Sequence, residues 1–346
     1  MRHPSDQRSR RAFLTRAGGA SLGVASLLAT RGELDAAAAA FGSNVGQDVT
    51  AGDIAILKFL AAAELVEDDL WQQYCELAVN NRPFRRALGA IDPALVRYIC
   101  DDRDDERSHA NLINAFLIAI GEQPVDLDAF RTLPSSPAPG ADDYGRLTSL
   151  TRLTVDTSWY MRYRSAGNPD FGDRFDQIVR IEKRATIPTE KFTNLFEAQL
   201  LAHSAAFHFA AIEQGGSSLY TSLIPKVTSL DVLAILSSIG PTEVYHFSAF
   251  HKSLEGIFGL AGDGLRFPDL RNRPSLSQAI FPEPCTFLRK GLPLCSVIRP
   301  RSTEKAGAVA AATGLVQSGL FTGQSSDFLN AVVALATAAD ASTRGF

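Results

Sequence analysis

Two Glu-x-x-His pairs and two single glutamates are the residues of this chain best suited to chemistry. In chain order they are Glu64, Glu106–His109, Glu213 and Glu243–His246. Residues three positions apart lie on one face of a helix, so each pair can direct a carboxylate and an imidazole to one point. Four carboxylates and two imidazoles suit two divalent ions such as iron, manganese or zinc. Because this is the ligand set of a dinuclear site in a four-helix bundle, we predict that these six residues bind two metal ions, with iron expected ahead of manganese.

The two single glutamates strengthen this prediction. Glu64 lies in the stretch AAAELV and Glu213 in FAAIEQ, so both interrupt apolar helix faces. A buried carboxylate without a partner is costly, which favours a ligand over an ordinary core or surface residue.

Several neighbours could support the ligands. Glu67 lies one turn after Glu64 and could be a further ligand or a hydrogen-bonding neighbour of one. Asp102 and Asp105 each lie one turn before a residue of the first pair and could orient it, but a solvated helix face is the favoured interpretation of both.

Aromatic and histidine side chains near the site have structural interpretations. Trp71 and Tyr220 each follow a single glutamate by seven residues, which is two helical turns. We interpret both as core aromatics rather than redox relays. Three further histidines fall off the ligand faces and are expected to be structural or exposed: His203, His208 and His251.

Apolar periodicity predicts the elements that position these residues. The chain is expected to be all-α, with four bundle helices over about 53–79, 93–121, 189–222 and 229–258. Asp53 and Thr189 are candidate N-caps, and Asp92-Pro93 would open the second helix with proline at its first position. Antiparallel hairpins of these lengths bring the single glutamates close to the pairs. Pro241 should kink the fourth helix.

The long connection between the second and third helices runs from Pro124 to Pro188 and is typical of a crossover in a ferritin-like bundle. Its stretch 147–167 is expected to be helical. Residues 50–260 would form the bundle, and residues 261–346 a loop-rich extension with two small helices over 303–320 and 325–340.

Residues 1–40 have the features of a twin-arginine export signal. Arg10 and Arg11 precede Phe13 and Leu14, a mild apolar run follows, and the small residues of 36–40 would suit a signal peptidase. An uncleaved anchor or a basic tail is the alternative. No later segment has the roughly 18 apolar residues of a membrane span, so the mature chain is expected to be periplasmic or otherwise extracytoplasmic.

The distribution of charge limits the classes of function that remain, and the placement of the cysteines suggests which of them are paired. The whole chain has a net charge of −4 and residues 1–40 carry +3, so the remainder carries −7. This negative charge argues against nucleic-acid binding. Cys285 and Cys295 flank a Pro/Gly loop, and we predict a disulfide between them in an oxidising compartment. Cys75 and Cys100 are interpreted as buried thiols, with a bridge between them left open.

The motifs resemble those of a ferritin-like family of exported bacterial proteins that also includes plant desiccation-related proteins. The family's Leu-Glu-x-Leu-Glu-x-x-x-aromatic pattern is similar to residues 63–71, and its Glu-x-x-His with a Leu-Gly end is similar to residues 106–121. The pattern Phe/Ile-Glu-x-x-Gly-x-x-x-Tyr resembles residues 212–220, and the last Glu-x-x-His fits residues 243–246. The resemblance covers about 50–260 and implies a four-helix bundle that can bind metal, without implying a reaction.

Three functions follow as expectations. A dinuclear iron or manganese site would support oxidase, ferroxidase or peroxide-scavenging chemistry with dioxygen or peroxide as the small oxidant. The alternative is a non-catalytic structural or desiccation-protection bundle that any bound metal merely stabilises. A metal-free bundle that holds an apolar ligand would require protonated or exposed glutamates. A homodimer is compatible with all three.

Overall fold

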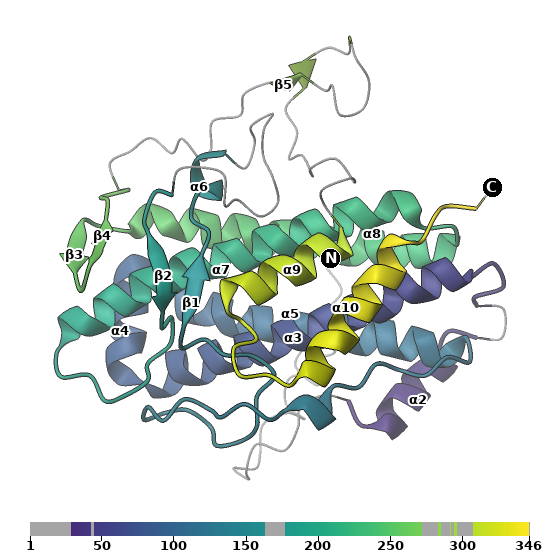
Figure 1. Ribbon diagram of the computed structural model, residues 1–346, viewed down its shortest axis with the longest axis horizontal. Coiled ribbons are helices and arrows are strands. Elements are labelled where there is room, and N and C mark those ends of the chain that lie inside the picture. Colours follow the sequence, from purple (N-terminus) through teal and green to yellow (C-terminus); the bar gives the residue numbers. More distant parts are fainter. Residues whose placement is uncertain are drawn as a thin grey trace, which may run out of the picture.

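Four long helices form a bundle along the longest axis of the molecule (Figure 1). The computed structural model of the chain describes residues 29–42, 45–162, 177–271, 283–284, 291, 294–295 and 307–345. The bundle helices are α3 (Ala51–Asn80), α5 (Leu95–Ala119), α7 (Leu195–Leu223) and α8 (Leu230–Ser253). Helix α3 packs against α5, and α7 against α8. The predicted all-α four-helix bundle is confirmed.

Side-chain caps place the helix ends differently from the sequence prediction. The N-cap of α3 is Thr50, which forms a capping box with Asp53, so the prediction of Asp53 as N-cap was wrong. Asp53 also accepts hydrogen bonds from the backbone of Thr228 and Ser229, which joins the start of α3 to the start of α8. The N-cap of α7 is Asn194 rather than Thr189.

The hairpin between α3 and α5 contains a further helix, α4 (Arg82–Ile91). The Asp92 side chain accepts a hydrogen bond from Ala94 N at 2.8 Å, so a turn separates α4 from α5 and the second bundle helix begins at Leu95, not at Pro93. Helix α8 contains Pro241 and ends at Ser253, where a 3₁₀ turn (η3, Leu254–Gly256) follows. The hairpin of β3 (Leu260–Gly262) and β4 (Leu265–Phe267) comes next.

The described part of the crossover between α5 and α7 is mostly without regular secondary structure. It contains η1 (Asp128–Phe130), and β1 (Leu153–Val155) pairs with β2 (Ile181–Arg184). In the described part of 147–167, only α6 (Trp159–Arg162) is helical, so the prediction of a helix there was wrong. The alternation of Thr with Leu and Val in this stretch favours a strand with one buried face.

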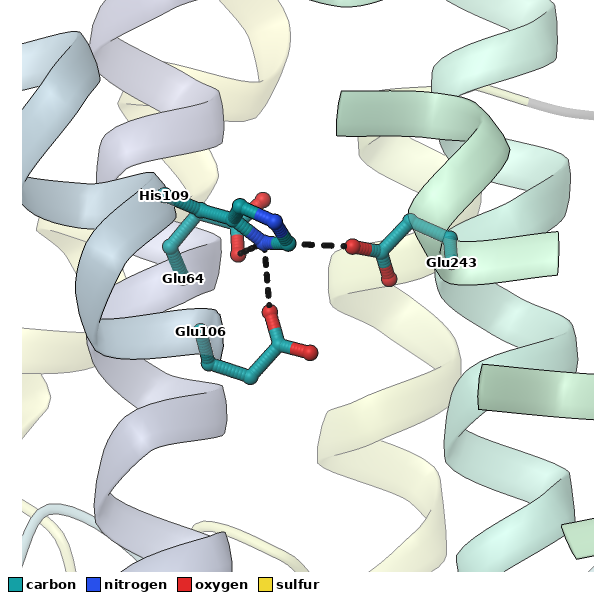
Figure 2. Close-up of side chains that lie close together, drawn as sticks. All are labelled: Glu64, Glu106, His109 and Glu243. Atoms are coloured by element: carbon teal, nitrogen blue, oxygen red, sulfur yellow. Dashed lines mark hydrogen bonds and ion pairs between the residues drawn. The ribbon is translucent and has the colours of Figure 1, made fainter. Parts of the chain in front are cut away.

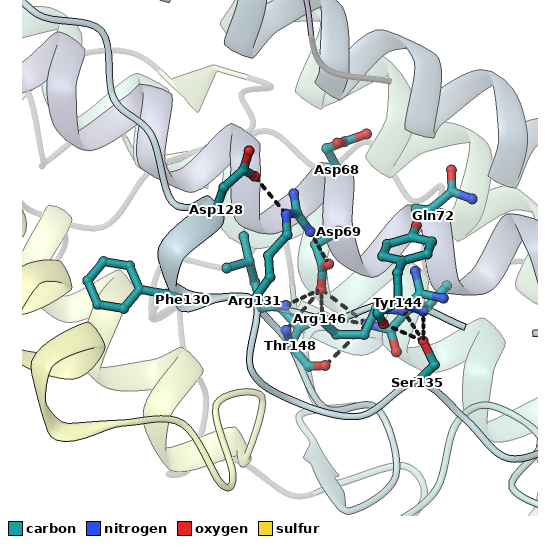
Figure 3. Close-up of polar contacts among 12 residues, drawn as sticks. Asp68, Asp69, Gln72, Asp128, Phe130, Arg131, Ser135, Tyr144, Arg146 and Thr148 are labelled. Carbon is teal, nitrogen blue, oxygen red and sulfur yellow. Dashed lines mark hydrogen bonds and ion pairs between the residues drawn. The ribbon is translucent and has the colours of Figure 1, made fainter. Parts of the chain in front are cut away.

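A buried carboxylate on α3 fixes the crossover to the bundle (Figure 3). Asp69 accepts hydrogen bonds from Arg131 at 2.7 Å, from Leu147 N at 3.1 Å and from Thr148 N at 2.9 Å. The fully buried Arg146 forms a second ion pair with Glu76 of α3. These contacts hold the connection against the outer face of α3, opposite the side that faces the bundle.

The C-terminal extension contains the two predicted helices, α9 (Ala308–Ser318) and α10 (Ser326–Asp340), and α10 packs against α3. Asp340 accepts hydrogen bonds from Ala308 N and Val309 N at 3.0 and 2.9 Å and thereby caps α9. Lys226, in the 3₁₀ turn η2 (Ile224–Lys226) between α7 and α8, also contacts Asp340. Two-residue strands β5 (Glu283–Pro284) and β6 (Leu294–Cys295) pair within this extension.

Helix α2 (Arg31–Ala39) packs against α5 through Leu34 and Ala38. The predicted cleavage stretch 36–40 therefore lies at the end of this helix, and Arg10 and Arg11 lie outside the described residues. None of the described helices combines the length and the apolar character that crossing a bilayer requires.

A disulfide joins the first hairpin of the bundle. Cys75 of α3 and Cys100 of α5 are bonded, with their Cα atoms 5.0 Å apart. The interpretation of these residues as buried thiols was wrong, because adjacent antiparallel helices bring the two positions within bonding distance. Cys285 lies outside the described residues, so its predicted bridge to Cys295 stays a prediction.

Candidate metal centre

All four bundle helices direct acidic or imidazole side chains to one buried region. The six residues singled out by their spacing are each at most 7% exposed: Glu64, Glu106, His109, Glu213, Glu243 and His246. Together with Asp102 they form two groups of four that share Glu106, and within each group the donor atoms lie within 4.8 Å of one another. One group is Glu64, Glu106, His109 and Glu243, and the other is Asp102, Glu106, Glu213 and His246.

The first group converges on the ring of His109 (Figure 2). Its Nδ1 lies 3.0 Å from Glu106 Oε2, 3.3 Å from Glu64 Oε2 and 3.5 Å from Glu243 Oε1. The carboxylates come from three different helices, so the imidazole nitrogen marks a point that α3, α5 and α8 all approach.

The second group converges on His246 in the same way. Its Nδ1 lies 2.8 Å from Asp102 Oδ1, 3.1 Å from Glu106 Oε1 and 3.4 Å from Glu213 Oε2. The two imidazole rings are 6.3 Å apart between centroids. Glu106 therefore places one oxygen in each group, which is the position of a carboxylate able to bridge two ions.

The aromatic residues two turns beyond the single glutamates bind them crosswise. Trp71 of α3 donates its indole N–H to Glu213 Oε1 of α7 at 3.0 Å, and Tyr220 of α7 donates its hydroxyl to Glu64 of α3. Both aromatics are core residues, as predicted. Their hydrogen bonds leave the other oxygen of each glutamate free to face the centre of the bundle.

The structure explains why the motif of residues 212–220 has a glycine at Gly216 of α7. A Cβ atom there would collide with Glu243 Oε2 from α8. The absence of a side chain at this position gives the Glu243 carboxylate its space between the two helices.

Asp105 and Asp102 both contact His246, although a solvated helix face was the favoured interpretation of each. Asp105 is half-exposed, and its Oδ2 lies 3.1 Å from His246 Nε2. This contact turns the other ring nitrogen, Nδ1, toward the centre. Asp102 is buried in the second group, so for this residue the solvated interpretation was wrong. It is the one member of either group that the predicted ligand set lacked.

Glu67 is half-buried and belongs to neither group. Burial and the nearby charges of Glu106 and Glu64 raise its pKa well above the usual value. The raised pKa favours the neutral, protonated form of Glu67 beside the cluster.

Burial and mutual repulsion disfavour the charged forms of several carboxyl groups in the cluster. Burial, followed by the charges of neighbouring carboxylates, raises the pKa of Glu106 and of Glu243 well above the usual range. The pKa of Glu213 is raised for the same two reasons, with Asp102 as the first charged neighbour. Burial opposes protonation of His109, but its hydrogen bonds to Glu106 and Glu64 raise its pKa to about 10.

Unsatisfied buried atoms show that the donor set fits metal ions. Within the described part of the chain, these inward-facing atoms have no hydrogen-bond partner: Glu64 Oε2, Glu106 Oε1, Glu213 Oε2, both Glu243 oxygens and His246 Nδ1. Buried polar atoms are almost always satisfied in native proteins. Carboxylate oxygens with imidazole nitrogens form a donor set for iron, manganese or zinc.

Comparison with known families adds a finding that is independent of this geometry. The family described as a ferritin-like domain matches residues 52–256, which is more than half of the chain. The chain belongs to the ferritin-like domain family. The matched range of this ferritin-like domain begins at the start of α3 and ends in the 3₁₀ turn after α8, so it contains every residue of both groups. Searches among curated proteins and among solved structures found no match.

The three histidines set aside as structural or exposed are all buried and belong to neither group: His203, His208 and His251. Their structural interpretation therefore agrees with their positions. His208 Nδ1 lies 2.8 Å from the hydroxyl of Tyr74, a contact between α7 and α3 that no local spacing in the sequence indicates.

Proposed function

We propose that this ferritin-like domain binds two iron or manganese ions between its four helices. The observation that supports this proposal most strongly is the set of unsatisfied buried atoms aimed at two points that share Glu106. Such atoms would cost several kcal/mol in an apolar interior unless cations neutralised them. Glu64, His109 and Glu243 would hold one ion, Glu213 and His246 the other, and Glu106 would contact both.

A redox-active pair of ions bound there would supply electrons for the reduction of dioxygen or peroxide. The chain's own residues would hold the ligands for that chemistry. Tyr220 and Trp71 fix the outer oxygens of Glu64 and Glu213, and Asp105 fixes the ring of His246. Burial of the whole cluster excludes bulk water, which strengthens each electrostatic interaction inside it.

Metal content tests the proposal directly. Full-length protein purified without added chelator should contain about two iron or manganese atoms per chain by elemental analysis, as expected for a paired carboxylate site. Glu106→Gln should lose most of this metal because it removes the shared carboxylate. Asp101→Asn, on the same helix but exposed and paired with Arg97, is the matched control and should keep it. Wild-type protein without metal would refute the proposal.

A second candidate is a stress-protection bundle in which metal only stabilises the fold. The observation in its favour is that the ligand groups are almost completely buried, which limits access for an oxidant. Thermal unfolding with and without chelator separates the two. Metal at 100 times its Kd should add about 2.7 kcal/mol to the free energy of unfolding in either case. Only the redox function also predicts consumption of dioxygen or peroxide by the metal-loaded protein.

We further propose that the chain is exported by the twin-arginine route. The Cys75–Cys100 disulfide supports this, because stable disulfides are characteristic of oxidising compartments. Arg10→Lys combined with Arg11→Lys keeps the charge and removes the paired arginines. Cell fractionation should then find the chain inside the cytoplasm, whereas unchanged export would refute this route.

A further inference from the structure

Helix α5 carries a second buried acidic residue in contact with the cluster. Asp102 lies one turn before Glu106 on the same helix face and is 2% exposed. Neither of its carboxylate oxygens has a hydrogen-bond partner among the described residues. Its Oδ1 is 2.8 Å from His246 Nδ1, which makes it the carboxylate nearest to that nitrogen.

A role confined to orienting His246 does not account for this placement. Asp105 already occupies the outer ring nitrogen, Nε2, and so fixes the ring. Asp102 approaches the inner nitrogen, at the same point that Glu106 and Glu213 approach. A carboxylate at that point competes for the position that a metal ion would take, unless it is itself a ligand of that ion.

The two halves of the bundle differ at this position. On α8 the residue four places before Glu243 is Ile239, a buried aliphatic side chain, where α5 has Asp102 before Glu106. The fifth carboxylate of the two groups therefore lies beside His246, and α8 supplies no acidic residue from the equivalent position beside His109. The two helices that carry Glu-x-x-His pairs, α5 and α8, thus differ at this position.

We propose that Asp102 is a seventh protein ligand, that it serves only the metal position beside His246, and that it makes this position selective for an ion able to carry three positive charges. The inference rests on the proposed metal site. The four glutamates balance two divalent ions, and Asp102 adds one more negative charge in a buried region. An unbalanced buried charge is costly, so two metal ions with a combined charge of +5 would match these five carboxylates better than two ions with a combined charge of +4. Iron and manganese can meet this preference, whereas zinc cannot.

Titration of metal-free, full-length protein with Mn²⁺, with free Mn²⁺ followed by electron paramagnetic resonance, tests this ligand. The wild type should bind two ions in two steps of unequal affinity. Asp102→Asn should weaken the tighter step by at least about tenfold, the lower limit seen when even an outer partner of a metal ligand is removed. Asp101→Asn, its exposed neighbour, should leave both steps unchanged. In iron-loaded protein, Asp102→Asn should also shift the midpoint potential upward, because less negative charge stabilises the reduced pair.

Two results would overturn the inference and can be told apart. Two unequal steps that are identical in the wild type and Asp102→Asn would show that Asp102 is not a ligand, with the metal site itself intact. A wild type that binds no Mn²⁺ or iron would overturn the proposed function as well. Circular dichroism checks that the variants fold, and Asp102→Glu, which keeps the charge, should retain more of the tight step than Asp102→Asn.

Discussion

At the scale of single residues, the hydrogen bonds of Trp71 and Tyr220 cross between the halves of the bundle. Each residue follows one single glutamate by two turns but donates to the other one. Donor groups that fix a metal-binding carboxylate typically change metal affinity by about 10- to 100-fold when removed. The two aromatics therefore tie the geometry of each proposed metal position to the helix that supplies the other.

Tyr220→Phe tests this coupling with the loss of one oxygen atom. We expect metal affinity to fall by about 10-fold or more, because Glu64 loses the donor that holds its outer oxygen. Competition with a chromogenic chelator measures the change. Tyr245→Phe, which removes a hydroxyl from an exposed position of α8, is the control and should have no effect. Equal affinities in the two variants would contradict the coupling.

Spacing, with the apolar surroundings of the single glutamates, was sufficient to predict six residues that the structure brings together, and their role as metal ligands stays a prediction. Spacing was insufficient for Asp102, although its four-residue distance from Glu106 places both on one helix face. The charged run of residues 101–107 suggested solvent on that face, but the approach of α7 and α8 removes Asp102 from water. Burial of a charged residue depends on a neighbouring helix that local sequence does not identify.

At the scale of elements, long apolar stretches predicted the four bundle helices but not their ends. The ends depend on single capping hydrogen bonds, such as the one between Thr50 and Asp53, which compete with several plausible caps nearby. The crossover was the largest error, because β1 and β2 form by pairing with each other and β1 packs on α7 and α9, contacts that local periodicity does not indicate. The Cys75–Cys100 bridge likewise depends on the register between two helices.

The contacts of Asp69 predict how the crossover is held. Asp69→Ala removes the buried acceptor of Arg131, Leu147 N and Thr148 N, and it should lower the free energy of unfolding by about 3–5 kcal/mol. Asp128→Ala removes an exposed partner of the same arginine and should cost less than about 1 kcal/mol.

Urea denaturation measures both values. Hydrogen exchange should also show faster exchange of residues 131–148 in Asp69→Ala alone. Similar losses in the two variants would mean that the buried position of Asp69 contributes nothing special to holding the crossover.

At the scale of the whole molecule, buried neutral histidines make stability sensitive to acid. Burial lowers the pKa of His208 to about 3, from an ordinary value of 6.5. Its Nδ1 faces the hydroxyl of Tyr74, which in turn contacts the hydroxyl of Thr186. Below pH 6.5 the unfolded chain binds a proton at His208 that the folded chain does not. The contribution of His208 to the free energy of unfolding therefore decreases by about 1.4 kcal/mol for each unit by which the pH falls from 6.5 to about 3.

His208→Asn isolates this effect, because an asparagine can place a polar atom near Nδ1 without titrating. As the pH falls below 6.5, the free energy of unfolding of the wild type should decrease by about 1.4 kcal/mol per pH unit relative to that of the variant. Urea titrations from pH 7 to pH 4 measure it. Parallel curves for the two proteins would show that His208 does not remain neutral in the fold.

Under the proposed export route, the disulfide between α3 and α5 implies an order of assembly. The twin-arginine route carries proteins that have already folded, and thiols remain reduced in the cytoplasm where that folding occurs. A chain exported in this way would fold its helices and take up its ions before Cys75 and Cys100 are joined. The covalent bond would then be the last step of maturation, and it would close around a cluster selected from the metals of the cytoplasm rather than from those outside.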